Sequence, residues 1–288
     1  MTAEHRRGLL LVAAGALVWS VGGLVFRLIH VDLMTVISGR SGLAGLFLLI
    51  LLAFRTRGSP WSAFACLGWP GILVALLFMV DSASFIAALH YTSIAHVVVI
   101  LSLTPLFAAL LGWFTMSEAV RPRVWIAMAI ALGGVCVMVS ESLQSGGWIG
   151  DLLALAVPIL MAIITVITRR HPQVDLLTAV CLAALLSGLV FLPFAQFSQP
   201  TPQDWALMAL LGIIEFGGGL MLYLAGAKRV PAAEAALMSL LETVLAPLWA
   251  WLVIAENPGE RAILGGAIVL AAVAAPLLAD LRPAAASN

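Results

Sequence analysis

Ten apolar stretches, each long enough to cross a lipid bilayer as a helix, follow one another along the chain of 288 residues. A transmembrane helix needs about 20 predominantly apolar residues. Hydrophobic residues make up 63% of the chain and charged residues only 10%, which is too little polar surface for a water-soluble globule of this length. We therefore expect an all-α polytopic membrane protein with ten transmembrane helices, at 8–29, 33–54, 67–89, 95–115, 124–141, 149–168, 174–195, 205–226, 232–255 and 262–280.

The basic residues predict which way the chain enters the membrane. Short loops rich in Lys and Arg stay in the cytoplasm. Of the 14 basic residues, Arg27, Arg40 and Arg261 lie elsewhere, and the other 11 fall on the side that an even number of crossings gives to the N-terminus. Both termini are therefore expected in the cytoplasm. The 11 residues are Arg6, Arg7, Arg55, Arg57, Arg121, Arg123, Arg169, Arg170, Lys228, Arg229 and Arg282.

Charge and cysteine content exclude several classes of protein. The formal net charge is zero, which argues against a nucleic acid as partner. Cys66, Cys136 and Cys181 are widely spaced within apolar stretches, so we expect neither a disulfide framework nor a metal site. The sequence contains no His-rich cluster and no serine nucleophile with a nearby base, so we expect no enzyme and no cofactor.

The second half of the chain repeats the first half weakly. At an offset of 142 the first helix matches the sixth, and at an offset of 138 the end of the fourth matches the end of the ninth. The unit is therefore five helices, at 1–146 and 147–288, and the second copy must enter the membrane from the opposite side because five is odd. Chance alignment of sequences rich in Ala, Leu and Gly is the alternative. The matched pairs are Gly8 with Gly150, Leu10 with Leu152, Leu11 with Leu153, Ala14 with Ala156, Arg27 with Arg169, Ala95 with Ala233, Trp113 with Trp251, Glu118 with Glu256 and Arg123 with Arg261.

Inverted repeats have a mechanical consequence. They place a pseudo-two-fold axis in the membrane plane, which gives two exchangeable conformations, each open to one face, around a site near the midplane. The repeat therefore predicts transport by alternating access.

Two regions stand out, one within Ala88 to Gly112 and the other within Pro231 to Leu248. They resemble the EamA-type transporters of the drug/metabolite transporter superfamily, and the likeness extends over the whole chain. The first helix, with Ala16 to Ser20, is similar to that of bacterial amino acid exporters of the aromatic amino acid type. The resemblance implies ATP-independent export of amino acids and similar small amphipathic metabolites across the bacterial inner membrane. Thr243 departs from the proline that Pro105 predicts for the second half. The regions are Ala88 to Ser93, Leu103 to Gly112 with Glu118, and Pro231 to Glu234, Leu245 to Leu248 and Glu256.

Four ionisable residues lie in the middle of predicted spans, where a charge costs roughly 2.5 to 3.5 kcal/mol on insertion scales. They are Arg40, Asp81, Glu215 and Glu242. Intramembrane charges are functional by default. We therefore expect the acids to face a shared cavity and to bind a substrate ammonium or a coupling proton, while Arg40 binds an acid or a substrate carboxylate.

Helical spacing places further side chains beside these charges. Phe78, Ser82 and Phe85 share a face with Asp81, and Gly219 shares one with Glu215. The predicted substrate-binding residues are Trp19, Arg40, Phe78, Asp81, Ser82, Phe85, Glu215, Gly219, Tyr223 and Glu242. The alternative for Arg40 is a permanent structural ion pair with one acid. Proton antiport and facilitated diffusion both remain open.

Prolines and glycines inside the spans are candidate hinges because proline deletes an intrahelical hydrogen bond. The candidates are Pro105, Pro158, Pro247 and Gly218. Static kinks are the alternative. Gly133, Gly134, Gly265 and Gly266 instead favour close helix packing, within a monomer, which we expect, or across a dimer.

Other polar residues lie near predicted helix ends. We interpret His90, His96 and Glu234 as solvated helix ends, and Glu118 and Glu256 as structural. The leading functional hypothesis is an amino acid exporter. The alternatives are a transporter of another small metabolite or of a drug-like cation, and a channel, which would need a continuous polar stripe.

Overall fold

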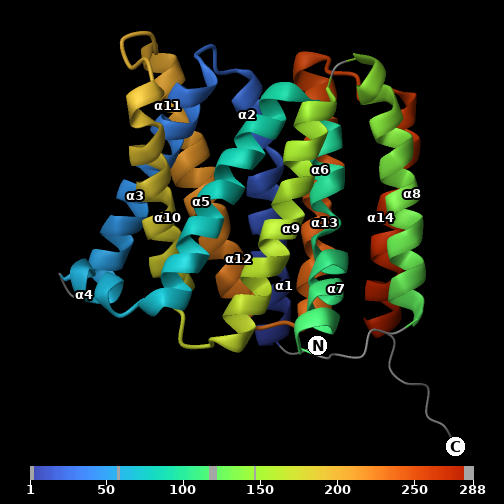
Figure 1. The fold of residues 1–288 in the computed structure, drawn as a ribbon, viewed down its shortest axis with the longest axis horizontal. Coiled ribbons are helices and arrows are strands. Elements are labelled where there is room, and N and C mark those ends of the chain that lie inside the picture. The colour runs from blue at the N-terminus through green and yellow to red at the C-terminus, as the bar shows by residue number, and fades with distance from the viewer. Residues whose placement is uncertain (1–2, 57–58, 117–121, 146, 282–288) are drawn as a thin grey trace, which may run out of the picture.

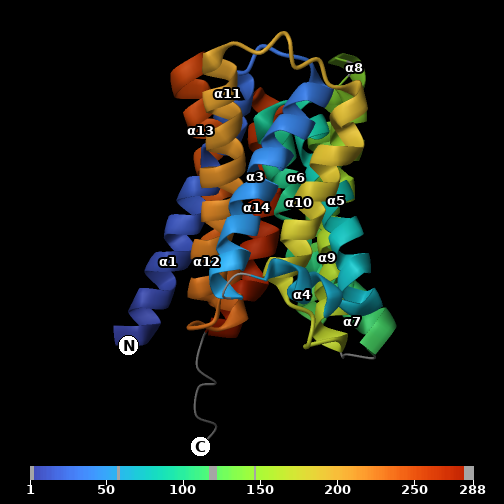
Figure 2. The same cartoon turned by 90° about the vertical axis from the view of Figure 1, so that its left-hand side faces the viewer.

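Long helices standing side by side build the whole of the described structure, a computed structural model that describes residues 3–56, 59–116, 122–145 and 147–281 (Figures 1 and 2). Within these ranges the secondary structure is helical and no strand forms. Glu118 and Arg121 lie outside the described residues. The elements are α1 (Ala3–Ser20), α2 (Gly22–Arg27), α3 (Leu33–Arg55), α4 (Pro60–Ala65), α5 (Gly68–Tyr91), α6 (Ile94–Leu101), α7 (Thr104–Met116), α8 (Pro122–Ser145), α9 (Trp148–Arg170), α10 (Leu176–Phe191), η1 (Leu192–Phe194), α11 (Pro202–Ala209), η2 (Leu210–Gly218), α12 (Gly219–Ala227), α13 (Ala232–Ile254) and α14 (Glu260–Leu281).

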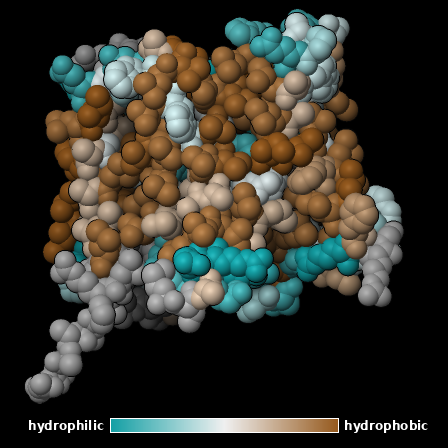
Figure 3. Space-filling model, turned by 180° about the vertical axis from the view of Figure 1, so that it is seen from behind, coloured by the Kyte–Doolittle hydropathy of each residue, from teal (hydrophilic) through white to brown (hydrophobic). Residues whose placement is uncertain are grey.

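The described helices are suited to a membrane. Nine segments within the described ranges are long and apolar enough to cross one. On the face seen in Figure 3, apolar side chains form a broad belt, with hydrophilic side chains gathered toward the two ends of the bundle. The start of α1 and the end of α14 lie at the same end of the bundle (Figure 1). The count of ten spans and the cytoplasmic location of that end stay predictions.

The packing of the helices is symmetric between the two halves of the chain. Helix α5 of the first half packs against α9 of the second. The pair related to it by exchanging the halves, α12 against α1, is also in contact. In the same way, the contact of α7 with α9 corresponds to that of α13 with α1. The contacts of α3 with α10 and of α8 with α14 each join two equivalent helices of the two halves. Helix α1 rises from the end that holds the termini, whereas α9 descends toward it (Figure 1). This is the contact pattern that a two-fold axis in the membrane plane produces.

Two predicted spans are broken, which differs from the continuous helices expected over 8–29 and 95–115. The first separates into α1 and α2 at Val21, and the fourth into α6 and α7 after Leu101. At the second break the hydroxyls of Ser102 and Thr104 donate to the carbonyl oxygens of Val99 and Leu101, each at 2.6 Å. Pro105 follows within the first turn of α7, where its missing N–H costs no helical hydrogen bond.

The eighth span changes its winding in the middle. Between α11 and α12 the nine residues of η2 form a π-helix instead of the regular α-helix expected over 205–226. π-helical turns are rare in proteins, and those that occur are often found at functional sites. Glu215 lies within η2 and is therefore held by the irregular part of its span.

Helices α8 and α14 approach each other closely at a pair of glycines. A Cβ atom added to Gly134 would lie 2.8 Å from the carbonyl oxygen of Gly265 and 2.8 Å from Val269 Cγ2. One residue earlier, a Cβ atom on Gly133 would meet nothing within 4 Å. The two helices can therefore tolerate a methyl group at one glycine and not at its neighbour.

We predict that Gly134→Ala destabilises the protein, because an overpacked contact costs about 1 to 3 kcal/mol, whereas Gly133→Ala does not. The midpoint of thermal unfolding in detergent should fall only for Gly134→Ala. Equal midpoints for the two variants would contradict the close contact of α8 with α14.

Candidate functional site

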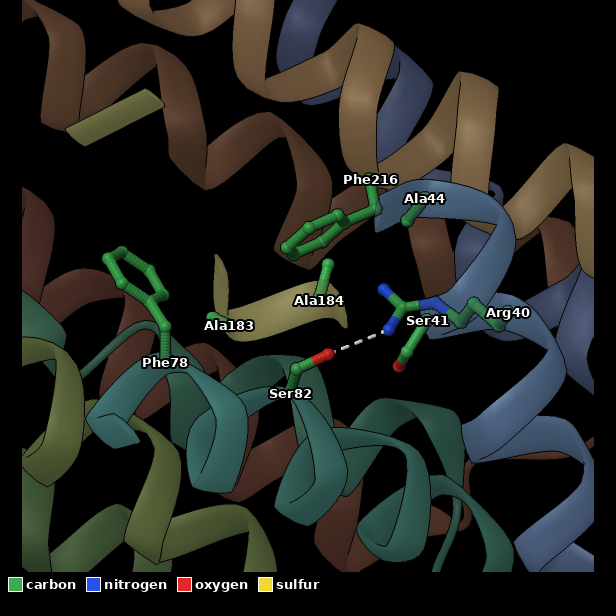
Figure 4. A pocket seen from close by; sticks show the side chains of 8 residues that line it. All are labelled: Arg40, Ser41, Ala44, Phe78, Ser82, Ala183, Ala184 and Phe216. Carbon is green, nitrogen blue, oxygen red and sulfur yellow. Dashed lines mark hydrogen bonds between the residues drawn. The ribbon is translucent and has the colours of Figure 1, made fainter. Parts of the chain in front are cut away.

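Arg40 lies at the centre of the candidate site, on α3, and only 2% of the residue is exposed. Its Nη1 donates a hydrogen bond of 2.8 Å to Ser82 Oγ on α5 (Figure 4). Its Nη2 donates to Glu215 Oε2 on η2 at 3.2 Å. The guanidinium also lies over the ring of Phe216, with Cζ 5.0 Å from the ring centroid. One buried cation therefore joins α3 and α5 of the first half to η2 of the second.

Close helix contacts make room for the ion pair. Glu215 is 5% exposed, and a Cβ atom on Gly22 would lie 2.8 Å from its Oε1. Gly212, one turn before Glu215, lies directly against the backbone carbonyl oxygen of Arg40, where no Cβ atom would fit. The pair thus depends on two close approaches at glycines, of η2 to α3 at Gly212 and of α2 to η2 at Gly22.

Two polar atoms of the site have no hydrogen-bond partner among the described residues. They are Arg40 Nε, a donor, and Asp81 Oδ1, an acceptor, and both are buried. Asp81 lies near enough to Arg40 for the two charges to attract. Buried polar groups are nearly always hydrogen-bonded in proteins, so unpaired ones call for an explanation. The site therefore offers both a donor and an acceptor to a further group.

A small cavity opens beside Arg40 (Figure 4). The volume of the cavity is about 10 Å³, which suffices for about one water molecule. An amino acid does not fit without rearrangement of the helices. The lining residues are Arg40, Ser41, Ala44, Phe78, Ser82, Ala183, Ala184 and Phe216.

The structure brings some of the predicted residues together at this cavity. Arg40, Phe78 and Ser82 line it, and Glu215 is bonded to Arg40. Phe85 lies elsewhere, packed against a core cluster that includes residues of α5 and α6. Arg40 is paired with Glu215 in this structure, and the choice between a structural and a substrate-binding role stays a prediction.

A second group of predicted residues lies where α1 packs against α12. The rings of Trp19 and Tyr223 are 5.3 Å apart between centroids, and the indole of Trp19 covers Gly219. On α13, the half-buried Glu242 lies within electrostatic range of Glu215. These residues do not line the cavity, and of them Glu242 is the one related to Glu215.

The candidate hinges fall at different kinds of position. Pro158 and Pro247 lie inside α9 and α13, whereas Pro105 follows the break before α7. Gly218 is the last residue of η2. Their role as hinges stays a prediction.

Several lining residues were not predicted from the sequence. Phe216 carried a signal because it adjoins Glu215, and Ser41 adjoins Arg40. Ala44, Ala183 and Ala184 carried none, since alanine is common throughout the spans and only the packing of α3 on α10 selects these three.

The interpretation of His96 as a solvated helix end is wrong. The His96 side chain is 6% exposed, and its Nδ1 lies 3.0 Å from Asp151 Oδ1 on α9. Asp151 also accepts a hydrogen bond of 2.7 Å from Thr92 Oγ1. The sequence could not show this because the contact joins the start of α6 to the start of α9.

We predict that Arg40→Met alone lowers the free energy of unfolding by about 3 to 5 kcal/mol, since it leaves a buried carboxylate without its cation. Adding Glu215→Leu to Arg40→Met should restore most of that loss. Chemical unfolding in detergent measures both values. A double variant less stable than Arg40→Met would contradict direct coupling of the two charges.

The EamA-like transporter family matches the chain twice, over residues 6–140 and 148–277. An uncharacterized transporter of Pseudomonas aeruginosa (PA0485) is 25% identical, with 95% of this chain and 94% of that protein aligned. A biotin transporter of Escherichia coli K12 is 24% identical over 84% of this chain and 83% of its own length. An S-adenosylmethionine uptake transporter of Rickettsia prowazekii is 24% identical over 70% and 69%.

A solved crystal structure has the same fold. It superposes with a TM-score of 0.68 at 21% sequence identity and covers 96% of this chain and 99% of its own. Together with the double family match, this places the two halves within one known architecture. The chain therefore belongs to the EamA-like transporter family, and it is a multi-pass transporter of the bacterial inner membrane and not an enzyme.

Proposed function

We propose that this transporter exports amino acids and similar small amphipathic metabolites by alternating access. The observation that carries the proposal is the buried Arg40–Glu215 ion pair, 3.2 Å between Nη2 and Oε2, beside a cavity in the middle of the bundle. Burying two charges away from water is unfavourable unless they are well paired. Ionisable residues inside a membrane protein therefore often mark the binding site of a charged solute.

The charges of the site are complementary to a zwitterion. Arg40 offers a guanidinium to a carboxylate, for which its planar geometry is suited. Asp81 and Glu215 offer carboxylates to an ammonium group. The unpaired atoms, Arg40 Nε and Asp81 Oδ1, are one donor and one acceptor, as a zwitterion requires.

The apolar part of the solute has a place as well. Phe78 and Phe216 line the cavity, Phe216 beside Arg40 and Phe78 on the side away from it (Figure 4). Aromatic faces accept rings and aliphatic chains alike. Two relatives are named for biotin and S-adenosylmethionine, and both of these molecules carry a carboxylate beside an extended body, as amino acids do. A carboxylate for Arg40 is the chemistry that these solutes share.

The small size of the cavity beside Arg40 favours a carrier over a channel. The cavity holds about one water molecule, so a solute enters only when the helices move. The interruption of the first span beside Gly22 and the π-helix in the eighth give the bundle places to bend near the site.

Proton-coupled uptake is the second candidate, favoured by a relative named as an uptake transporter. In this structure the Arg40 guanidinium is bonded to the Glu215 carboxylate. If a solute carboxylate replaces Glu215 there, a proton on Glu215 removes the competing charge, and proton and solute bind together as in symport. If a solute ammonium instead displaces a proton from Asp81 or Glu242, the two exchange, as export by antiport requires.

We predict that Asp81→Asn and Glu215→Gln each lower the rate of amino acid transport by about tenfold or more, the factor expected when a hydrogen bond to a charged group is lost. The assay is uptake of labelled amino acids into proteoliposomes. Glu4→Gln is the matched control, because Glu4 is an acid with a 70% exposed side chain paired to Arg229. Wild-type rates in both site variants would reject their assignment.

We further predict that a pH gradient accelerates transport in one direction only. Uptake driven by an acidic exterior would indicate symport, and uptake driven by an acidic interior would indicate antiport and thus export. The gradient should lose its effect in the acid variant that carries the proton. Equal rates with and without a gradient of either sign would exclude proton coupling.

A drug-like cation is distinguished in the same proteoliposomes. It would compete with amino acids through Asp81 or Glu242 and would not need Arg40. Amino acid methyl esters, which lack the carboxylate, therefore serve as competitors. Strong competition by the esters would favour the cation alternative over the zwitterion.

A further inference from the structure

A polar network ties together helices of the two halves at the end of the bundle opposite the termini, here called the outer end. Arg27, the last residue of α2, donates from Nε to Glu256 Oε2 at 2.9 Å. Its Nη2 donates to the carbonyl oxygen of Thr92 at 2.7 Å. The other oxygen of Glu256, Oε1, accepts the backbone N–H of Ile94 at 2.8 Å. Arg27, Thr92 and Ile94 belong to the first half, and Glu256 belongs to the second.

Glu256 makes two separable interactions. Ile94 is the first residue of α6, so the carboxylate satisfies an N–H group that has no partner within its helix, at the end of the helix where negative charge is favoured. The same carboxylate pairs with Arg27. The Arg27 and Glu256 side chains are 25% and 21% exposed, so water screens this pair less than an ion pair on an open surface.

The two helices held by Glu256 are the outer halves of the two broken spans. Helix α2 is separated from α1 at Val21, and α6 is separated from α7 after Leu101. They also touch directly, because a Cβ atom on Gly23 would lie 2.9 Å from Ile94 Cγ2. The pair α2 and α6 thus forms one contact at the outer end, in which α6 also packs against α9 and α13.

One of these segments contacts the candidate site. Gly22, the first residue of α2, lies against Glu215, whose carboxylate is bonded to Arg40. A displacement of Glu215 by a solute therefore acts on α2 at its inner end, and Arg27 lies at the other end of the same helix. The chain of contacts runs from the cavity to the ion pair through one short helix.

We propose that α2, α6 and Glu256 form the outer gate of the transporter, with the Arg27–Glu256 ion pair holding it closed. The inference rests on the proposed alternating-access function and adds the residues that control one face. Opening toward the outer end requires Glu256 to leave Arg27, while the inner halves α1 and α7 stay in place.

The test measures access to the cavity without any solute. Ala184 lines the cavity and bears no polar partner, so Ala184→Cys is the reporter, in a background of Cys66→Ser, Cys136→Ser and Cys181→Ala. A membrane-impermeant maleimide is applied to right-side-out and to inside-out vesicles. Glu256→Gln removes the charge pairing and keeps an oxygen for the Ile94 N–H, so it isolates the ion pair from the helix cap. Arg27→Gln removes the pairing from the other side.

We expect both variants to raise the labelling rate from the outer end by about three- to fivefold, the factor by which losing a partly exposed ion pair shifts a two-state equilibrium. Labelling from the opposite end should not rise. Arg55→Gln is the matched control, because Arg55 pairs with Asp175 between the two halves at the end that holds the termini. It should leave labelling from the outer end unchanged.

Unchanged outer labelling in Glu256→Gln and Arg27→Gln would overturn the gate. Equal increases from both ends, or an equal increase in Arg55→Gln, would also overturn it, since either result indicates general loosening. Elution as a single species in detergent shows that each variant is folded. The labelling uses no solute, so it is independent of the transport assay. Increased labelling without amino acid transport would reject the proposed function and leave the gate. Amino acid transport with unchanged labelling would reject only the gate.

Discussion

The ion pair between Arg40 and Glu215 is the interaction on which the arrangement of the site depends. Both side chains are almost fully buried in the bundle, where bulk water does not reach either charge. Their pairing requires η2 to lie against α3 at Gly212 and α2 to lie against Glu215 at Gly22. The close packing around the cavity follows from the need to keep two opposite charges together in an apolar medium.

Two of the irregular segments lie beside this pair. Glu215 lies in the π-helix η2, and the break between α1 and α2 adjoins Glu215 through Gly22. Backbone that departs from regular helix at membrane depth is tolerated where protein buries it. The straight pair α8 and α14, which contact through Gly134 and Gly265, lies apart from the site. Two irregular segments, η2 and the interruption between α1 and α2, thus adjoin the ion pair, whereas the regular helices α8 and α14 do not.

Much of the fold is predictable from the sequence, because hydropathy and length suffice to find a span. The span expected at 33–54 is α3, Leu33–Arg55, and that expected at 232–255 is α13, Ala232–Ile254. The buried charges are predictable for the same reason, since Arg40 and Glu215 interrupt apolar stretches. Which charges meet is not predictable, because that depends on the rotation of each helix about its own axis.

The remaining features arise from contacts between distant segments. The break after Leu101 depends on hydroxyl groups that turn back onto the backbone, and a hydropathy pattern does not record which way Ser102 and Thr104 point. The burial of His96 depends on Asp151, 55 positions away. Phe85 shares a helical face with Asp81, and yet it packs in the core, because the face of α5 is wider than the cavity.

The hydrogen bond from the Ile94 N–H to Glu256 also bears on how the protein is made. The N-terminal half leaves the ribosome and enters the bilayer well before Glu256 is synthesised, so helix α6 first exists without its acceptor. Its start is completed only when the loop after α13 arrives from the last part of the chain. One backbone N–H of the first half is thus paired only after the last part of the chain has been made.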